Sequence, residues 1–239
     1  MQNTLTIARR EFQSYFNGPV AYIVICMLLL ALGIFFFWWP THFFLAGRAE
    51  ARGMFTVMSY LLIFAAPAMT MALLAEEKRA GTIELLITMP VRDADVIIGK
   101  YLGVLGLYAV VLLLTLPYPI SVSALGDMDW GPVWSGYLGL FLEGAAMLAI
   151  GLMASSWTEN QLIAFFIALV LCMFFGLVHM TLPLFSGTVA TVFEWLSLHV
   201  HFRSMARGVI DTRDLVYFLT VAGFALAVAF RSLESRRWR

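Results

Sequence analysis

Residues 101–126 read YLGVLGLYAVVLLLTLPYPISVSALG, a run of 26 residues without a charged side chain. An α-helix needs about 20 apolar residues to cross the hydrocarbon core of a bilayer. Backbone N–H and C=O groups find no water there, so a continuous apolar run can satisfy them only as a helix. The run therefore predicts a membrane-spanning helix, and not a barrel strand, which would alternate in hydrophobicity over about 10 residues.

Five further apolar runs follow the same pattern. Of the 239 residues, 62% are hydrophobic and only 13% are charged, about half the charged share of soluble domains. This composition excludes a disordered chain and argues against a soluble globular domain. We therefore predict an all-α integral membrane protein with a single transmembrane domain over 1–239, and kinks at Pro67, Pro117 and Pro119. The predicted spans are 19–40, 54–76, 95–121, 132–156, 160–180 and 213–231.

Net charge and cysteine content narrow the functional classes further. The 15 basic and 15 acidic residues cancel, so no basic surface for nucleic acid is expected. Cys26 and Cys172 both lie inside apolar runs. We expect them to be small buried hydrophobic residues without a disulfide.

The residues before the first span have an amphipathic pattern. Leu5, Ala8, Phe12, Tyr15 and Phe16 recur at helical spacing within 3–17. This spacing favours an interfacial helix on the membrane surface, with a frayed tail as the alternative. The segment is too polar, and the following apolar run too long, for a cleavable signal peptide.

Lysine and arginine positions predict the orientation. An even number of spans puts both termini on one side, and ten of the 15 basic residues fall on that side. The excess favours both termini in the cytoplasm. The five on the other side are Arg48, Arg52, Arg203, Arg207 and Arg213.

The longest polar stretch on the predicted cytoplasmic side begins at Glu76 and ends at Lys100. Gly81 is expected to end the second helix, Thr82 to cap a short helix over 82–89, and Pro90 to end it. A short capped helix at the membrane surface is suited to docking a soluble partner. A solvated connector is the alternative reading.

The segment 183–208 is apolar but interrupted by Pro183 and Gly187. It is too long for a loop and too broken for a span. We expect a pair of short helices that dip part-way into the membrane on the far side, which is tolerated where protein covers the backbone.

One ionisable side chain, Glu143, falls near the middle of a predicted span. A charged group there is costly unless paired, which makes it a functional candidate. A structural hydrogen bond to a neighbouring helix explains it equally well. His199 and His201, with His179 nearby in the sequence, could suggest a metal site, but histidines two apart on a helix point in different directions. We therefore predict no metal site.

Sequence motifs for nucleotide binding and for hydrolysis are absent from the 239 residues. There is no G-x-x-x-x-G-K-[ST], no H-E-x-x-H and no G-x-S-x-G. The chain is therefore predicted not to be an enzyme and to hold no cofactor, and a membrane-embedded enzyme is the least favoured class.

Two segments carry a resemblance to a known family. They are EEKRAGTIELLITMP at 76–90 and RSMARGVIDTRDLVYF at 203–218. Together with the amphipathic start, the six spans and the broken hairpin, they resemble the permease subunit of ABC-2 type transporters along the whole chain. Within that family the chain looks most similar to gliding-motility GldF-type and NosY-type permeases.

The resemblance implies a set of parts and partners. The start would be an elbow helix, 82–89 a coupling helix seated on a separate ABC ATPase, and 183–208 a pair of re-entrant helices. Two permease chains, identical or one GldG-like, would pair above two ATPase copies that bind ATP and Mg²⁺, in a bacterial inner membrane. Export is the implied direction. The candidate coupling residues are Glu76, Glu77, Gly81, Thr82 and Glu84, and Glu143 is the candidate for helix pairing or gating.

Two functions are compatible with these parts. The first is transport of a substrate across the membrane, driven by the ATPase. The second is mechanical transmission, in which the chain passes ATP-driven motion to a periplasmic or membrane partner and moves no solute. A polar path through the permease pair would favour transport, and an apolar seam would favour transmission.

Overall fold

A computed structural model describes residues 2–38, 50–81, 93–185 and 187–234, and all regular structure within these ranges is helical. The first half contains α1 (Gln2–Asn17), α2 (Val20–Gly33), the π-helix η1 (Ile34–Trp38), α4 (Arg52–Thr70), α5 (Ala72–Arg79), α7 (Asp93–Leu114) and α8 (Pro117–Ser123). The second half contains α9 (Trp130–Ser155), α10 (Gln161–Leu177), the 3₁₀ helix η2 (Val178–Leu184), α11 (Thr188–Leu196), α12 (Leu198–Met205) and α13 (Thr212–Glu234).

Six helical segments are long and apolar enough to cross a membrane, as the sequence predicted. Several end at other residues than expected, because adjoining helices continue them. They are Ala21–Trp38, Arg52–Arg79, Asp93–Ser123, Trp130–Ser155, Gln161–Leu184 and Thr212–Glu234.

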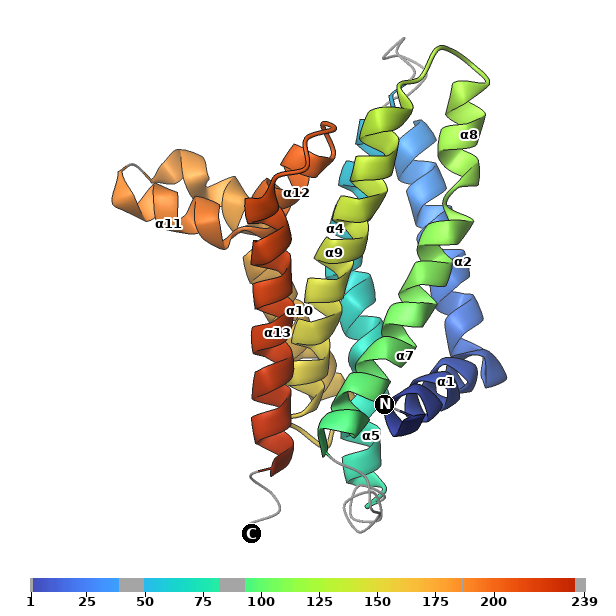
Figure 1. The fold of residues 1–239 in the computed structure, drawn as a ribbon, viewed down its shortest axis with the longest axis vertical. Helices are drawn as coiled ribbons and strands as arrows, with labels where there is room; N and C mark the ends of the chain where they lie inside the picture. The colour runs from blue at the N-terminus through green and yellow to red at the C-terminus, as the bar shows by residue number, and fades with distance from the viewer. Residues whose placement is uncertain (1, 39–49, 82–92, 186, 235–239) are drawn as a thin grey trace.

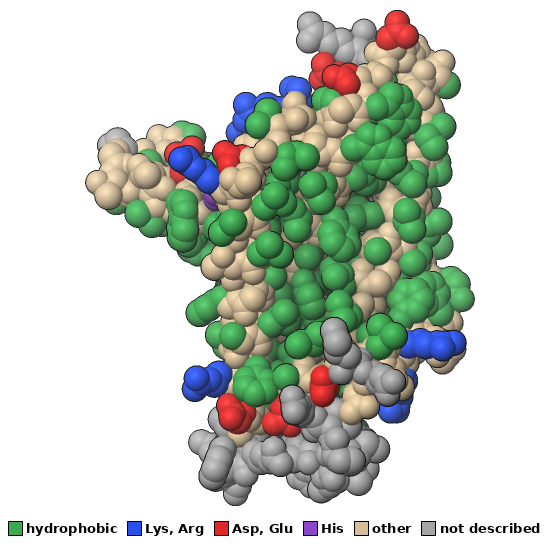
Figure 2. All heavy atoms as spheres, in the orientation of Figure 1, with side chains coloured by type: hydrophobic (Ala, Val, Ile, Leu, Met, Phe, Trp, Pro, Cys, Tyr) green, Lys and Arg blue, Asp and Glu red, His purple; other side chains and the backbone are tan. Residues whose placement is uncertain are grey.

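The bundle has two distinct ends (Figure 1). The terminal end contains α1, α5 and the last turn of α13, and the opposite end contains α8, α11 and α12. On the face drawn in Figure 2, charged side chains gather towards the two ends, and hydrophobic side chains cover the band between them. This distribution matches a protein that presents an apolar belt to lipid.

Helix α9 is the centre of the bundle. It contacts α4, α7, α10, α12 and α13, and 83% of its most apolar stretch is buried. Its glycines allow the neighbouring helices to approach closely, since a Cβ on Gly144 would lie 2.3 Å from the ring of Tyr108. Small residues at helix crossings are the usual means of tight packing in membranes.

The second and third spans, in which proline kinks were predicted, are both broken into two helices. The second span breaks at Met71, four residues after Pro67, between α4 and α5. Ser155 of α9 compensates for the break: its hydroxyl accepts from the N–H groups of Leu74 and Ala75, each at 3.1 Å. The third span breaks between α7 and α8, immediately before Pro117. Broken helices are tolerated where neighbours satisfy the backbone in this way.

The amphipathic N-terminal segment forms the helix α1, which lies across the terminal end of α7 (Figure 1). The contact uses glycines of α7: a Cβ on Gly99 would lie 2.7 Å from Ile7, and one on Gly103 would lie 2.6 Å from Glu11. Tyr15 Oη also donates to Met69 O at 2.8 Å. Burial raises the pKa of the Tyr15 phenol, so the hydroxyl stays a neutral donor.

One packing expectation needs correction. Cys172 is buried as predicted, but Cys26 is exposed, because it lies on the outer face of α2. Both cysteines are free. Leu5 of the apolar stripe of α1 is 72% exposed, as expected for a side chain of an interfacial helix.

The broken segment before the last span forms two short helices with different surroundings. α11 projects from the side of the bundle at the opposite end (Figure 1) and has no buried residue. α12 packs against α9 and buries Leu198, His199, Phe202 and Met205. The preceding span continues as η2 through Pro183, so the short helices begin later than the predicted residue 183.

Candidate functional site

The end of α5 carries the described part of the predicted coupling region. α5 ends at Arg79, and Gly81 follows with φ +67, a left-handed conformation that favours glycine after a helix. The expectation that Gly81 ends the second helix is therefore confirmed. The side chain of Glu76 is exposed. Thr82, Glu84 and the rest of 82–92 lie outside the described residues.

Glu77 belongs to an ion-pair cluster that joins three helices at the terminal end. Lys100 of α7 contacts Glu77 of α5 at 2.7 Å and also pairs with Glu11 of α1. The Lys100 side chain is only 3% exposed, against 26% for Glu77 and 19% for Glu11. A buried ammonium group requires such partners, so the cluster holds α1, α5 and α7 in one arrangement.

Lys78, the next residue, ties the same end to the rest of the bundle. Its ammonium group donates to the carbonyl oxygen of Ser156, just past the end of α9. Ser232 Oγ of α13 donates to that same oxygen at 2.9 Å. A cation at the C-terminus of a helix also meets the negative end of the helix dipole. The last turn of α5 therefore contacts α1, α7 and α9, and reaches α13 through Ser156.

Sequence reasoning missed Lys78, Lys100 and Glu11 as members of this site. The sequence did contain a signal for Lys100. This residue directly precedes the uncharged run 101–126, so it has to lie close to the membrane surface. A lysine in that position either reaches out to the interface or finds carboxylates.

Glu143, the second candidate site, lies in a buried cluster in the middle of the bundle. The residue is fully buried, and Ser59 Oγ of α4 donates to its Oε1 at 2.8 Å. The hydroxyl has one proton to give, so its oxygen accepts from Nδ1–H of His199, 3.0 Å away. Oε2 of Glu143 has no hydrogen-bond partner among the described residues.

Aromatic rings extend this cluster towards the opposite end. His199 stacks on His179 with ring centroids 4.5 Å apart and on Tyr60 at 5.0 Å. Burial lowers the pKa of His199 to about 4, with nearby His179 and Arg203 adding to the effect, so its imidazole is neutral near pH 7. His201 points elsewhere, to Asp214 of α13 at 2.7 Å. The expectation that His199 and His201 point apart is confirmed.

The cluster brings together side chains from four elements, α4, α9, α12 and η2. Within the described ranges, no group of three or more His, Cys, Asp or Glu side chains could hold a metal ion. Oε1 of Glu143 is part of a structural hydrogen-bond network between helices. Oε2 is buried without a donor, so it could accept one further hydrogen bond.

Comparison with protein families identifies the chain. The sequence model described as "ABC-2 family transporter protein" matches residues 49–230. A comparison with curated proteins found no match. The matched segment runs from just before α4 to the last turns of α13, and so includes the α5 end, Lys100 and the Glu143 cluster. Members of this family form the membrane-embedded, non-catalytic component of ABC transporters, which work with an ABC ATPase. The chain is a multi-pass membrane protein and belongs to the ABC-2 family of transporter proteins.

Proposed function

We propose that this chain is the permease subunit of an ABC exporter in a bacterial inner membrane, with both termini in the cytoplasm. The observation that carries the proposal is the family match over 49–230, combined with six candidate spans. ATP and Mg²⁺ would be bound by a separate ATPase, in two copies. The resemblance to GldF-type and NosY-type permeases remains part of this proposal.

The terminal end is the proposed ATPase-docking side. Glu76 is exposed on the last turn of α5, and the segment 82–89 follows within a few residues. In the proposed arrangement 82–89 is the coupling helix, and Thr82 and Glu84 belong to the docking surface together with Glu76. α1 would act as the elbow helix beside it.

The contacts of α5 offer a route by which motion at the docking surface would reach the spans. Displacing α5 would carry α7 with it through the Glu77–Lys100 pair, and the end of α9 through the contact of Lys78 with Ser156. Bound ATP can drive such a displacement only by binding one arrangement more tightly than the other. The pairs of Lys100 support this role because its ammonium group is buried and depends on carboxylates of α1 and α5, so α5 cannot move away without leaving that charge unpaired.

A second permease chain is part of the proposal. In the spans Ala21–Trp38, Gln161–Leu184 and Thr212–Glu234, only 22%, 28% and 22% of the most apolar stretch is buried, against 83% in Trp130–Ser155. Their exposed faces are apolar and include Leu30, Ile163, Phe166 and Val170. A partner chain, identical or GldG-like, would cover part of this surface. Glu143 is the proposed helix-pairing or gating residue within each chain.

The first experiment is a gentle-detergent purification of the tagged chain from its native membrane, with every co-purifying protein identified and counted. An ABC ATPase in equal amount supports the permease assignment. A folded preparation without any ATPase contradicts it. An ATPase together with a stoichiometric periplasmic partner, and no transport in vesicles, would favour mechanical transmission instead.

A second experiment tests the coupling role of Gly81 with a matched control. G81V and G187V place a β-branched residue at positive φ, +67 and +71, where nothing lies within 4 Å of the new Cβ. Both changes strain the backbone, by about 1–3 kcal/mol. Gly187 combines its positive φ with ψ −145, a region that glycine almost alone adopts, so G187V is the harsher of the two changes. Only G81V is expected to uncouple ATP hydrolysis from transport, because Gly187 lies at the opposite end. Equal transport per ATP in both variants would remove Gly81 from the coupling assignment.

A further inference from the structure

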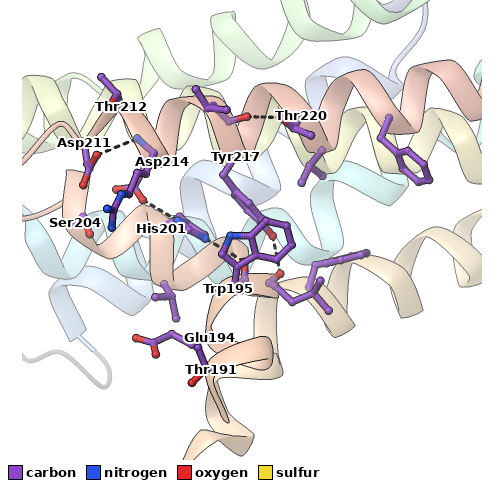
Figure 3. Close-up of a pocket in the computed structure, with 17 residues that line it drawn as sticks. Thr191, Glu194, Trp195, His201, Ser204, Asp211, Thr212, Asp214, Tyr217 and Thr220 are labelled. Atoms are coloured by element: carbon purple, nitrogen blue, oxygen red, sulfur yellow. Dashed lines mark hydrogen bonds and ion pairs between the residues drawn. The ribbon is translucent and has the colours of Figure 1, made fainter. Parts of the chain in front are cut away.

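The opposite end contains a hollow that the proposed function leaves unused. It lies in the angle between α11, α12 and α13, with Phe175 of α10 on one side, and has a volume of about 1030 Å³ (Figure 3). Ligand sites commonly measure about 300–1,000 Å³. Residues of α13 from Thr212 to Phe224 line it, which are the first turns of the last span.

The inner wall of the hollow is held rigid by His201. Its Nδ1 lies 2.7 Å from Asp214 Oδ1, and its Nε2 lies 3.1 Å from the carbonyl oxygen of Trp195. The ring also stacks on Tyr217 with centroids 4.0 Å apart, and the Tyr217 hydroxyl donates to Leu196 O at 2.6 Å (Figure 3). These contacts fix the end of α11 against α13.

Asp214 is the unusual member of this wall. Asp214 lines the hollow, yet it is only 6% exposed. Its Oδ1 is paired with His201, but Oδ2 has no hydrogen-bond partner among the described residues. A buried carboxylate oxygen without a donor is costly, and a donor brought by a ligand would satisfy it.

The hollow has a polar and an apolar part. The polar part, near the start of α13, includes Glu194, Asp211 and Arg213, all of them exposed. With Asp214, the lining of the hollow includes three carboxylates, one guanidinium and the His201 ring. The apolar part, deeper along the span, includes Phe175, Val221 and Phe224. A polar rim above an apolar wall at the end of a span matches the headgroup and acyl regions of one leaflet.

We propose that this hollow binds a bilayer phospholipid whose headgroup carries a primary ammonium, that is, a phosphatidylethanolamine. The acyl chains would lie along Phe175 and Phe224. The ammonium would donate to the rim carboxylates, and the phosphate would meet Arg213. A trimethylammonium headgroup has no N–H to donate, and an anionic headgroup meets an excess of carboxylates. The inference does not depend on the ATPase assignment.

The test uses the purified full chain in bilayers of equal parts phosphatidylethanolamine, phosphatidylcholine and phosphatidylglycerol. After gentle extraction, native mass spectrometry counts the lipids retained per chain. We expect phosphatidylethanolamine to be enriched at least about threefold over each of the others. The double variant E194Q/D211N changes two exposed side chains, so the fold should persist, and the preference over phosphatidylcholine should disappear.

A pair of matched variants tests the place of binding. Val216 and Leu219 are both exposed on α13, at 62% and 63%, but only Val216 lines the hollow. V216W should cut lipid retention at least twofold, and L219W should leave it unchanged. Equal retention of the three lipids in the unaltered chain, or equal retention by both tryptophan variants, would overturn the proposal. So would a change of oligomeric state in V216W without a change in bound lipid, since that would assign the hollow to a second copy of the chain.

Discussion

Lys100 and Glu143 are both buried ionisable residues on candidate spans, but their surroundings differ. Lys100 has two carboxylate partners, from α1 and α5. Glu143 has a serine hydroxyl, with two histidines beyond it, and no cation within ion-pair distance among the described residues. The terminal end is therefore held by opposite charges, and the middle of the bundle is held by hydrogen bonds between groups that can be neutral.

The two clusters should respond differently when one member is lost or changed. A charge-paired cluster resists the loss of any member, because each removal leaves an uncompensated buried charge. A hydrogen-bonded cluster tolerates isosteric changes and can rearrange with the protonation state of its members. We expect the terminal end to act as a rigid connection to the ATPase and the middle of the bundle to accommodate movement.

The strongest test of this contrast removes the ammonium group of Lys100. K100M keeps the length of the side chain but leaves Glu11 and Glu77 side by side without their cation. We expect a loss of about 3 kcal/mol, seen as a sharp drop in folded yield and thermal midpoint in detergent. R79M removes an exposed charge from the same end and should change stability by less than about 0.5 kcal/mol. A K100M variant as stable as R79M would show that the cluster does not hold this end together.

The second test concerns the tight helix crossing beside Glu143. In G144A the new methyl group would overlap the Tyr108 ring, so α7 and α9 must separate. We expect a loss of about 2–3 kcal/mol. Gly223 of α13 is the control, because nothing lies within 4 Å of a Cβ there, and G223A should be neutral or stabilising by about 0.5–1 kcal/mol. Equal thermal midpoints for the two variants would argue against close packing at Gly144.

The third test is the response of the middle cluster to acid. The pKa of His199 is lowered to about 4 in the folded chain, against an ordinary value of about 6.5. The unfolded chain therefore binds the proton more readily than the folded chain. The stabilisation of the folded state by neutral His199 is complete above pH 6.5 and is lost as the pH falls towards 4. Between pH 7.5 and pH 5 the folded state should lose roughly 2 kcal/mol. H199Q should lose less over the same range, and an identical loss in both proteins would contradict the assignment.

The smallest expected effect is that of an isosteric change at Glu143. E143Q keeps an oxygen that can accept from Ser59 Oγ, so stability should change by less than about 1 kcal/mol. E143A removes the acceptor and leaves a cavity, and should cost about 2–3 kcal/mol. If E143Q were as damaging as E143A, the carboxylate charge itself would be required, and the contrast with Lys100 would fail.

Much of the fold could be predicted because the membrane restricts the choices. Apolar runs such as 101–126 and 132–156 have to become helices, and Gly81 and Pro67 end or bend helices for local steric reasons. The candidate status of Glu143 followed from the cost of a carboxylate inside a span. The structure then showed its partners.

The partners themselves could not be predicted, since they come from residues distant in the sequence. Ser59 and His199 lie 84 and 56 positions from Glu143 in the sequence, and Glu11 lies 89 positions from Lys100. Such pairings depend on which face each helix turns to its neighbours, and six nearly uniform apolar helices carry little amphipathic signal. The exposed position of Cys26 was mispredicted for the same reason.

The central claim is that the terminal end, at the end of α5, docks an ABC ATPase. It is tested most directly by placing a photo-crosslinking amino acid at Glu76, which is exposed at that end, and at Leu125, which is 67% exposed after α8 at the opposite end. The two variants would be irradiated in native membranes and their adducts identified by mass spectrometry. We predict an adduct with the ATPase from position 76 and none from position 125. An ATPase adduct from position 125, or none from position 76 while the complex co-purifies intact, would contradict it.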